Sequence, residues 1–321
     1  CPKALNLQEV MPESVQRKTK NQVRTRIQAS KGLHWLVVIL ARLIAFPLFI
    51  FLHKLLPDPE WILQLDRILL FLGVFGLIEF VFKQFKPFVF AAFAAAVCWL
   101  LYGSFSGGYG FGHMATDYKV LVFGMLENPH PEKVLFDRLA PFPNRARVTD
   151  AIDFDNPEVR NFAITTTTKH FLENQNDPKY MTLIQCFAVF KEINTRWHYV
   201  NDPKSREYYA KASESVQHLA GDCDDHSIFM AACLRAVGGV PRLIHTRGHM
   251  YPELLIGNRH DLERLNYLIR RQLFREESKG QLIHYHIDTD GRIWLNLDYT
   301  ARYPGGKFLS EEILGVLQLV E

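Results

Sequence analysis

Three long apolar stretches, separated by short polar breaks, dominate the first third of the chain. They span residues 33–56, 61–82 and 88–102, and prolines and lysines mark the breaks between them. A helix needs about 20 apolar residues to cross a bilayer, with a range of roughly 17–25. The first two stretches meet this length, and the third meets it only with flanking residues. We therefore predict α-helical membrane spans within residues 33–103, with three spans favoured and two as the alternative.

The distribution of basic residues predicts an orientation. The tail formed by residues 1–32 carries many more Lys and Arg than Asp and Glu, and Lys83 and Lys86 lie between the second and third stretches. Basic segments that flank spans stay on the cytoplasmic side, next to anionic lipid. Three spans therefore place the rest of the chain outside the cytoplasm, whereas two spans place it inside. We expect membrane lipids, and no nucleic acid, to be the partners of this region.

Charged residues inside two of the apolar stretches indicate a further contact. Arg42 and Glu79 lie deep within their stretches, and a charge at that depth is costly unless it is paired. The two side chains are expected to contact each other or a membrane protein partner.

The five cysteines form neither a disulfide framework nor a zinc pattern. They are Cys1, Cys98, Cys186, Cys223 and Cys233. Their number is odd and their spacing matches no known framework or zinc ligand set. Cys1 is either a lipidated cysteine or a point of truncation, and the basic tail favours truncation. The sequence predicts no metal and no cofactor.

Residues 104–150 have no clear helical period. The stretch 103–112 is rich in glycine, and residues 118–123 have the composition of a strand. We interpret 104–150 as a linker or peripheral segment, followed by a separate domain over residues 151–321.

The pattern of residues 151–321 is that of a compact α+β domain. Helices are expected over 156–171 and 178–194, and a third begins at Cys223 and ends at Gly238. Strands are expected over 241–247, 249–256, 282–288 and 293–298, with an amphipathic helix inserted over 258–278.

The position of Cys223 predicts a reactive thiol. It lies at the expected start of a helix, between Asp222 and Asp224. The N-terminus of a helix stabilises a thiolate and lowers its pKa below the free value of about 8.5. Cys186 and Cys233 lie in apolar helical patterns, which are typical of buried, unreactive cysteines.

Two residues on the strands that follow complete a nucleophilic site. His249 begins one expected strand and Asp298 ends another. Thiol catalysis needs a base that reaches the sulfur and a third group that fixes the tautomer of the base. The sequence therefore predicts Cys223 as nucleophile, His249 as base and Asp298 as its orienter.

Three motifs in this region resemble those of the transglutaminase-like superfamily. They are Gly-Asp-Cys-Asp-Asp-His-Ser at 221–227, Gly-His-Met-Tyr-Pro-Glu at 248–253 and Trp-Leu-Asn-Leu-Asp-Tyr-Thr at 294–300. The resemblance covers about residues 197–300. It implies a papain-like core, in which the helix that carries Cys223 packs on an antiparallel sheet, and it implies the triad Cys223, His249 and Asp298. The insertion over 258–278, and Met250 where the family commonly has an aromatic residue, leave the substrate open.

The resemblance implies a cysteine enzyme that acts on protein or peptide amides, and the apolar stretches of residues 33–103 predict that it is membrane-anchored. We expect a bacterial member of the superfamily. Hydrolysis and transfer to an amine both remain open, and the alternative is a non-catalytic membrane scaffold that keeps the fold. With three spans, we expect the domain on the outer side of the bacterial inner membrane.

Four further features of the sequence carry weaker predictions. Trp197 and Asp222 are expected to bind substrate, although Trp197 also suits core packing. His226 is either a rival base or a polar residue of the helix. His284, His286 and Asp288 share one strand face, but no fourth ligand accompanies them, so a metal site is not predicted there.

Overall fold

The computed structural model describes residues 65–84, 86–126, 130–133, 140–202, 208–310 and 312–319, with a few positions between 39 and 52. It is a mixed α+β structure with a largely antiparallel sheet. The chain divides into two compact units, Cys1–Lys119 and Val120–Glu321. The basic tail and most of the first predicted span lie outside the described residues.

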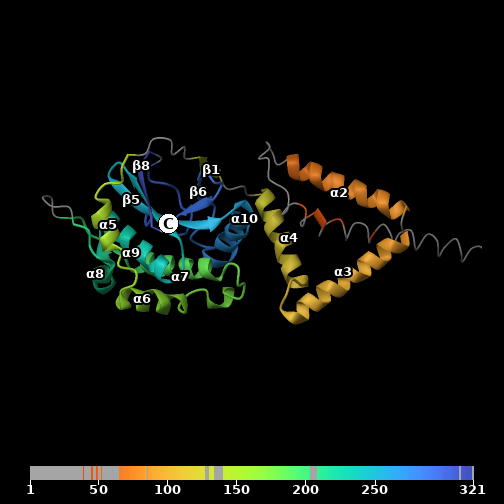
Figure 1. Cartoon of the computed structure of the whole chain (residues 1–321), viewed down its shortest axis with the longest axis horizontal. Helices are drawn as coiled ribbons and strands as arrows, with labels where there is room; N and C mark the ends of the chain where they lie inside the picture. The colour runs from red at the N-terminus through yellow and green to blue at the C-terminus, as the bar shows by residue number, and fades with distance from the viewer. Residues whose placement is uncertain are drawn as a thin grey trace, which may run out of the picture. The chain divides into compact units, whose positions relative to one another are not determined.

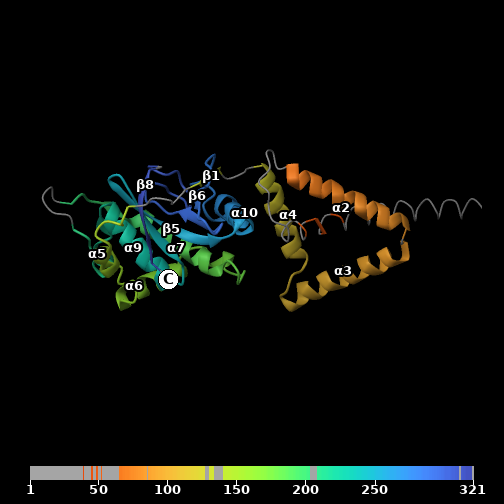
Figure 2. The ribbon, with the colours of Figure 1, turned by 45° about the horizontal axis from the view of Figure 1, so that its top comes forward.

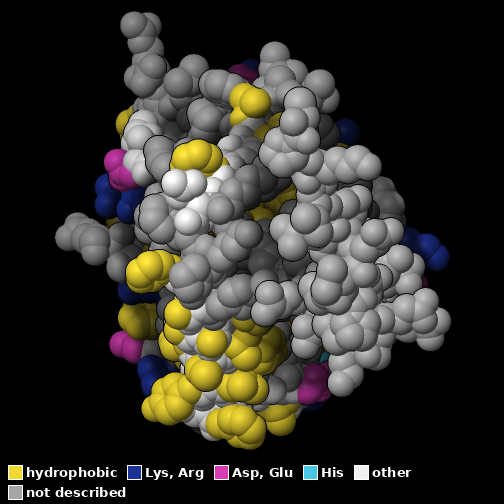
Figure 3. Space-filling view, turned by 90° about the vertical axis from the view of Figure 1, so that its right-hand side faces the viewer, with side chains coloured by type: hydrophobic (Ala, Val, Ile, Leu, Met, Phe, Trp, Pro, Cys, Tyr) yellow, Lys and Arg dark blue, Asp and Glu magenta, His cyan; other side chains and the backbone are white. Residues whose placement is uncertain are grey.

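The first unit consists of long helices. They are α2 (Leu65–Gln84), α3 (Lys86–Ser106) and the first part of α4 (Phe111–Leu126), which continues into the second unit (Figure 1). Large apolar side chains are exposed along α3, among them Phe88, Trp99, Tyr102 and Phe105. Figure 3 shows hydrophobic side chains gathered on one face of the molecule.

The turn between α3 and α4 is built by close contacts, and much of residues 104–126, where no helical period was expected, lies in these two helices. The Ser104 hydroxyl accepts a hydrogen bond from the Phe111 backbone N–H at 3.0 Å. A Cβ atom on Gly103 would lie 2.1 Å from the Tyr109 carbonyl oxygen, so only glycine allows this approach. The strand expected over 118–123 is also wrong, because these residues lie within α4. A short apolar run does not separate strand from helix by its periodicity.

The membrane criterion is met by no single helix. Within the described ranges, none is both long and apolar enough to cross a bilayer. Ala91–Ser106 and Phe111–Gly124 reach that length and apolarity only when taken together, across a bend of 102°.

A six-stranded sheet forms the centre of the second unit (Figures 1 and 2), in the order β1-β6-β7-β5-β4-β8. All neighbouring strands are antiparallel except β1 and β6. The strands are β1 (His130–Lys133), β4 (Pro241–Thr246), β5 (His249–Gly257), β6 (His284–Ile287), β7 (Ile293–Asn296) and β8 (Ile313–Gln318). The segment predicted as a linker therefore contributes an edge strand.

Helices pack against this sheet, and α9 is the most buried of them. Ten of its residues are buried, and it packs against β5, α6 and α7. The helices of this unit are α5 (Arg145–Ala151), α6 (Pro157–Thr167), α7 (Met181–Arg196), α8 (Ala212–His218), α9 (Cys223–Ala236) and α10 (Arg259–Leu268), with short turns at Leu172–Asn174 and Ile269–Leu273. A small pair of parallel strands, β2 (His198–Tyr199) and β3 (Ala220–Gly221), leads into α9. The predicted helix that begins at Cys223 is confirmed.

A buried ionic cluster ties three strands of the sheet together. The Glu253 carboxylate on β5 accepts a hydrogen bond from Arg242 Nε on β4 at 2.7 Å and contacts His286 Nδ1 on β6. Glu253 is 0% exposed and Arg242 is 1% exposed. The Arg242 guanidinium also lies over the Trp294 ring, 4.2 Å from its centroid. Each charge is therefore compensated by its partner and not by water.

Glu253→Ala is expected to lower the free energy of unfolding by about 3–5 kcal/mol, because it removes the buried carboxylate that contacts both Arg242 and His286. The measurement is urea unfolding of the full chain, followed by tryptophan fluorescence. Glu312→Ala is the matched control, since it breaks the exposed Arg247–Glu312 pair and should change the free energy by less than about 1 kcal/mol. Equal losses in both variants would contradict the importance of the buried cluster.

Candidate active site

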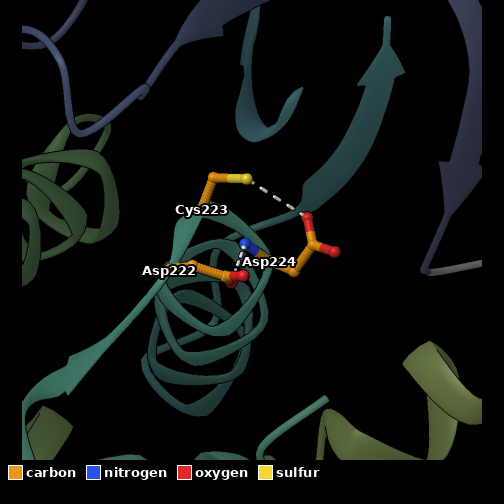
Figure 4. Close-up of side chains that lie close together, drawn as sticks. All are labelled: Asp222, Cys223 and Asp224. Carbon is orange, nitrogen blue, oxygen red and sulfur yellow. Dashed lines mark hydrogen bonds between the residues drawn. The ribbon is translucent and has the colours of Figure 1, made fainter. Parts of the chain in front are cut away.

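The start of α9 fixes the position of the Cys223 thiol. Asp222 caps the helix, and its Oδ1 accepts a hydrogen bond from the backbone N–H of Asp224 at 3.0 Å (Figure 4). The same oxygen accepts from the Asp225 backbone N–H at 3.4 Å. A Cβ atom at Gly221 would lie 2.4 Å from the Asp225 carboxylate, so glycine is required just before the cap. Cys223 is therefore the first residue of the helix, where its backbone N–H has no acceptor within the helix.

The surroundings of the sulfur hold it as a thiol. Cys223 Sγ donates to Asp224 Oδ1 at 3.4 Å, and Figure 4 shows the two side chains turned toward each other. Burial, together with the Asp224 and Asp222 carboxylates, raises the pKa of Cys223 to about 12, while the Met250 backbone N–H acts in the opposite direction. The sequence predicted a lowered pKa for Cys223, whereas these surroundings raise it. Burial and two nearby negative charges outweigh the stabilisation that a helix N-terminus gives to a thiolate.

Asp224→Asn is expected to lower the pKa of Cys223 and to speed its alkylation at neutral pH. The variant removes one of the two negative charges that raise the pKa of this thiol. Because only the thiolate is alkylated, the rate should rise as the pKa falls, by roughly threefold for each unit once the weaker nucleophilicity of a more acidic thiol is included. The measurement is the rate of iodoacetamide modification of the Cys223 peptide against pH. Asp150→Asn, at an exposed carboxylate, is the control, and equal rates in the two variants would contradict the charge effect.

His249 and Asp298 form the closest contact of the predicted triad. His249 begins β5, and Asp298 follows the end of the neighbouring strand β7. His249 Nε2 lies 2.7 Å from Asp298 Oδ2. The two residues are 6% and 1% exposed. In the tautomer whose Nε2–H donates to this carboxylate, Nδ1 keeps a lone pair and can accept a proton.

A hydroxyl joins the cysteine helix to the strand that carries the histidine. Ser227 Oγ lies 2.6 Å from the Cys223 carbonyl oxygen and 2.9 Å from the Met250 carbonyl oxygen. Its proton is donated to one of them at a time. The start of α9 is thereby held against the start of β5. The structure has no hydrogen bond between the two described side chains of Cys223 and His249, a separation common in ligand-free sites.

The predicted substrate-binding residues both have structural contacts. Trp197 Nε1 donates to the Gly221 carbonyl oxygen at 3.3 Å, and its ring packs against His226 and Phe229. Asp222 caps α9 as described above. These contacts support the helix on which the thiol sits, and a direct contact of either residue with a substrate stays a prediction.

Two tyrosines beside the triad were missed by the sequence analysis. The Tyr199 and Tyr299 rings are stacked, with centroids 5.5 Å apart, and the Tyr299 ring lies 5.9 Å from that of His249. Burial raises the pKa of Tyr299, and the neighbouring Tyr199 and Cys223 raise it further. Tyr299 follows the orienter directly, which is a local signal. Its pairing with Tyr199, 100 residues earlier, has no signal in a single sequence.

The possible metal ligands already have other partners. Asp222, Cys223 and Asp224 place one ligand atom each within 4.8 Å of one another, but helix capping and the thiol contact account for both carboxylates. His286 on β6 contacts Glu253, whereas Asp288, just after the end of β6, accepts from Trp294 Nε1 and Arg292 Nε. Those two side chains are therefore engaged separately.

Comparisons with known proteins provide no further identification. No protein-family model and no curated protein matches this chain, so its function is to be inferred from the residues of the site.

Proposed function

We propose that this chain is a membrane-anchored cysteine enzyme of the transglutaminase-like type, which acts on protein or peptide amides. Cys223 is the nucleophile, His249 the base and Asp298 its orienter. The observation that carries the proposal is the buried 2.7 Å contact between His249 Nε2 and Asp298, on strands next to a helix that begins with a half-buried cysteine.

Acylation follows from the protonation states of these groups. His249 Nδ1 takes the thiol proton, and the sulfur attacks the carbonyl carbon of the amide to form a C–S bond. Asp298 stabilises the imidazolium that results. The C–N bond then breaks, and the departing amine takes the proton from His249. The product on the enzyme is a thioester at Cys223.

The backbone N–H of Cys223 stabilises the tetrahedral intermediate, and a second nucleophile completes the catalytic cycle by removing the acyl group. At the first position of α9, this N–H points away from the helix body and is suited to the negative oxygen of the tetrahedral intermediate. Water or an amine then attacks the thioester with His249 as base. Water releases an acid, and an amine gives a new amide, so hydrolysis and transfer share one site.

The fold supports a papain-like core as part of this proposal. The buried helix α9 carries the nucleophile at its N-terminus and packs against β5, which carries the base. The orienter comes from β7, the neighbour of β5 in the sheet. This is the arrangement that the resemblance implies.

The membrane anchor in residues 33–103 is likewise proposed. The side chains of α3 are apolar on every face of the helix, and the exposed ones include Phe88, Trp99 and Phe105. A helix that is apolar all round is typical of burial in protein or lipid. Partners within the membrane, and a location of the domain outside the cytoplasm, belong to the same proposal.

A non-catalytic scaffold is the second candidate, and one observation favours it. The pKa of Cys223 is raised, and the thiol has no hydrogen bond to the described His249 ring. A protein that needed only the fold would keep such an unactivated thiol.

An electrophilic peptide amide, such as a chloroacetamide peptide, separates the two candidates. If His249 is the base, Cys223 should be labelled at pH 7.5, and His249→Ala should reduce the labelling rate by about 10²-fold or more. His284→Ala is the matched control, because His284 lies on β6 and its ring contacts Phe308. Equal labelling of Cys223 in wild type and His249→Ala would favour the scaffold.

A further inference from the structure

An asparagine at the end of α7 joins two segments around the site. Asn194 Nδ2 donates to the Ala301 carbonyl oxygen at 3.0 Å. Its Oδ1 therefore faces His226 Nε2, 3.0 Å away on α9. An amide oxygen only accepts, so His226 carries its proton on Nε2 and is a donor. The tautomer of His226 is thus fixed by a neighbour whose own orientation is fixed by the main chain.

His226 is held neutral and is not a rival base. Burial lowers the pKa of His226 to about 3, with Asp298 raising it and His249 lowering it. A base with this pKa takes up no proton near neutrality. In the described part of the chain, His226 Nδ1 has no hydrogen-bond partner. A buried acceptor left in this way costs about 1–3 kcal/mol, so fold stability alone does not explain a histidine here.

The segment held by Asn194 is the turn that carries the orienter. The Ala301 backbone N–H donates to the Asp298 carbonyl oxygen at 3.2 Å, and the Thr300 N–H donates to Asp298 Oδ1 at 3.1 Å. Asp298 Oδ2 is left for His249. A shift of this turn would therefore move the carboxylate relative to the imidazole.

The Tyr299 ring connects His226 to the catalytic imidazole. Its centroid lies 5.3 Å from the His226 ring and 5.9 Å from the His249 ring. On its other side, the His226 ring meets Trp197 edge to face at 5.2 Å. His226 therefore contacts the turn twice, once through Asn194 and once through Tyr299.

We propose that Asn194 and His226 are positioning residues of this site: they hold the Asp298–Ala301 turn, and with it Asp298 and the Tyr299 ring, against His249. The inference rests on the proposed roles of Cys223, His249 and Asp298, and it adds two residues that neither touch the reacting atoms nor exchange protons. Because the His226 ring is neutral, it does not compete with His249 as a cationic partner of the Asp298 carboxylate.

His226→Phe tests this by keeping a ring and removing the hydrogen bond to Asn194. A looser Asp298–His249 contact stabilises the imidazolium less, so the pKa of His249, measured by NMR of labelled histidine, should fall by on the order of half a unit. The alkylation rate of Cys223 at pH 7.5 should fall by roughly threefold or more. The melting temperature should change little, because the unmet acceptor at Nδ1 is removed while Asn194 Oδ1 loses its donor.

Four further variants make the result specific. His226→Gln places an amide N–H near the position of Nε2 and should restore most of the His249 pKa. Asn194→Ala should lower this pKa as His226→Phe does, and the double variant should lower it no further, since both act through one turn. His284→Phe, on β6, is the control and should leave the pKa unchanged.

The readout does not depend on turnover. An unchanged His249 pKa in folded His226→Phe and Asn194→Ala protein would overturn the inference, even if the enzyme is active. A shifted pKa in a protein that transfers no acyl group would support the positioning role and count against the proposed function. If the His249 pKa shifts of the two single variants add up in the double variant, the two residues do not act through the same turn.

Discussion

Cys223→Ser is expected to abolish acyl transfer and to leave the fold intact. The hydroxyl that replaces the thiol is a weaker nucleophile and holds its proton more tightly than a thiol in the same surroundings. The loss in the acylation rate should be about 10³-fold or more. The measurement is intact-mass detection of the acyl-enzyme after reaction with an activated acyl ester, which requires no knowledge of the natural substrate.

The exposed Cys98 provides the matched control for this prediction. Cys98 is an exposed free cysteine in the first unit, and Cys98→Ser should leave the acyl group on Cys223. The fold of Cys223→Ser should survive because the side chain is only half-buried and one small polar group replaces another. Acylation of Cys223→Ser at the wild-type rate would contradict a nucleophilic role for this residue.

The local architecture of the site could be predicted from the sequence. The helical pattern that follows Cys223 and stops at Gly238 predicted the helix that begins at Cys223. Alternating residues around the Asp290-Gly291 turn predicted the hairpin that ends near Asp298. Both signals are local, and a single sequence preserves them.

The electrostatics of the thiol could not be predicted in the same way. The sequence shows Asp222 and Asp224 on either side of Cys223, but it does not show that the sulfur is half-buried, nor that it lies 3.4 Å from Asp224 Oδ1. The helix N-terminus and the carboxylates act in opposite directions on the pKa. Which of them dominates depends on these distances and on burial.

Contacts between residues far apart in the sequence could not be predicted either. Asn194 reaches Ala301 and His226, and Tyr199 stacks on Tyr299. Each pair joins segments that only the folded sheet and helices bring together. The same holds for β1, whose pairing with β6 gives a place in the sheet to residues that looked like part of a linker.

His249→Ala is expected to reduce the acylation rate of Cys223 by about 10²–10⁴-fold, the usual contribution of a positioned general base. Asp298→Asn should cost less, because the imidazole remains and only its orientation and the stabilisation of its charged form are weakened. Glu312→Ala is the control. Glu312 is exposed and directly precedes β8, so this variant should leave the acylation rate unchanged.

The acylation rate of His249→Ala should depend on pH in a different way from the wild-type rate, and this difference tests the role of His249 most directly. Without a base, the reaction depends on the thiolate fraction, and the pKa of Cys223 is raised to about 12 by burial and by the Asp224 and Asp222 carboxylates. Well below that pKa, the thiolate fraction grows about tenfold for each pH unit. The rate of the variant should therefore rise without a plateau from pH 7 to pH 10, whereas the wild-type rate should level off once His249 is neutral. Added imidazole should restore part of the lost rate at pH 7. A variant that keeps the wild-type plateau would show that another group removes the thiol proton, and His249 would then not be the base.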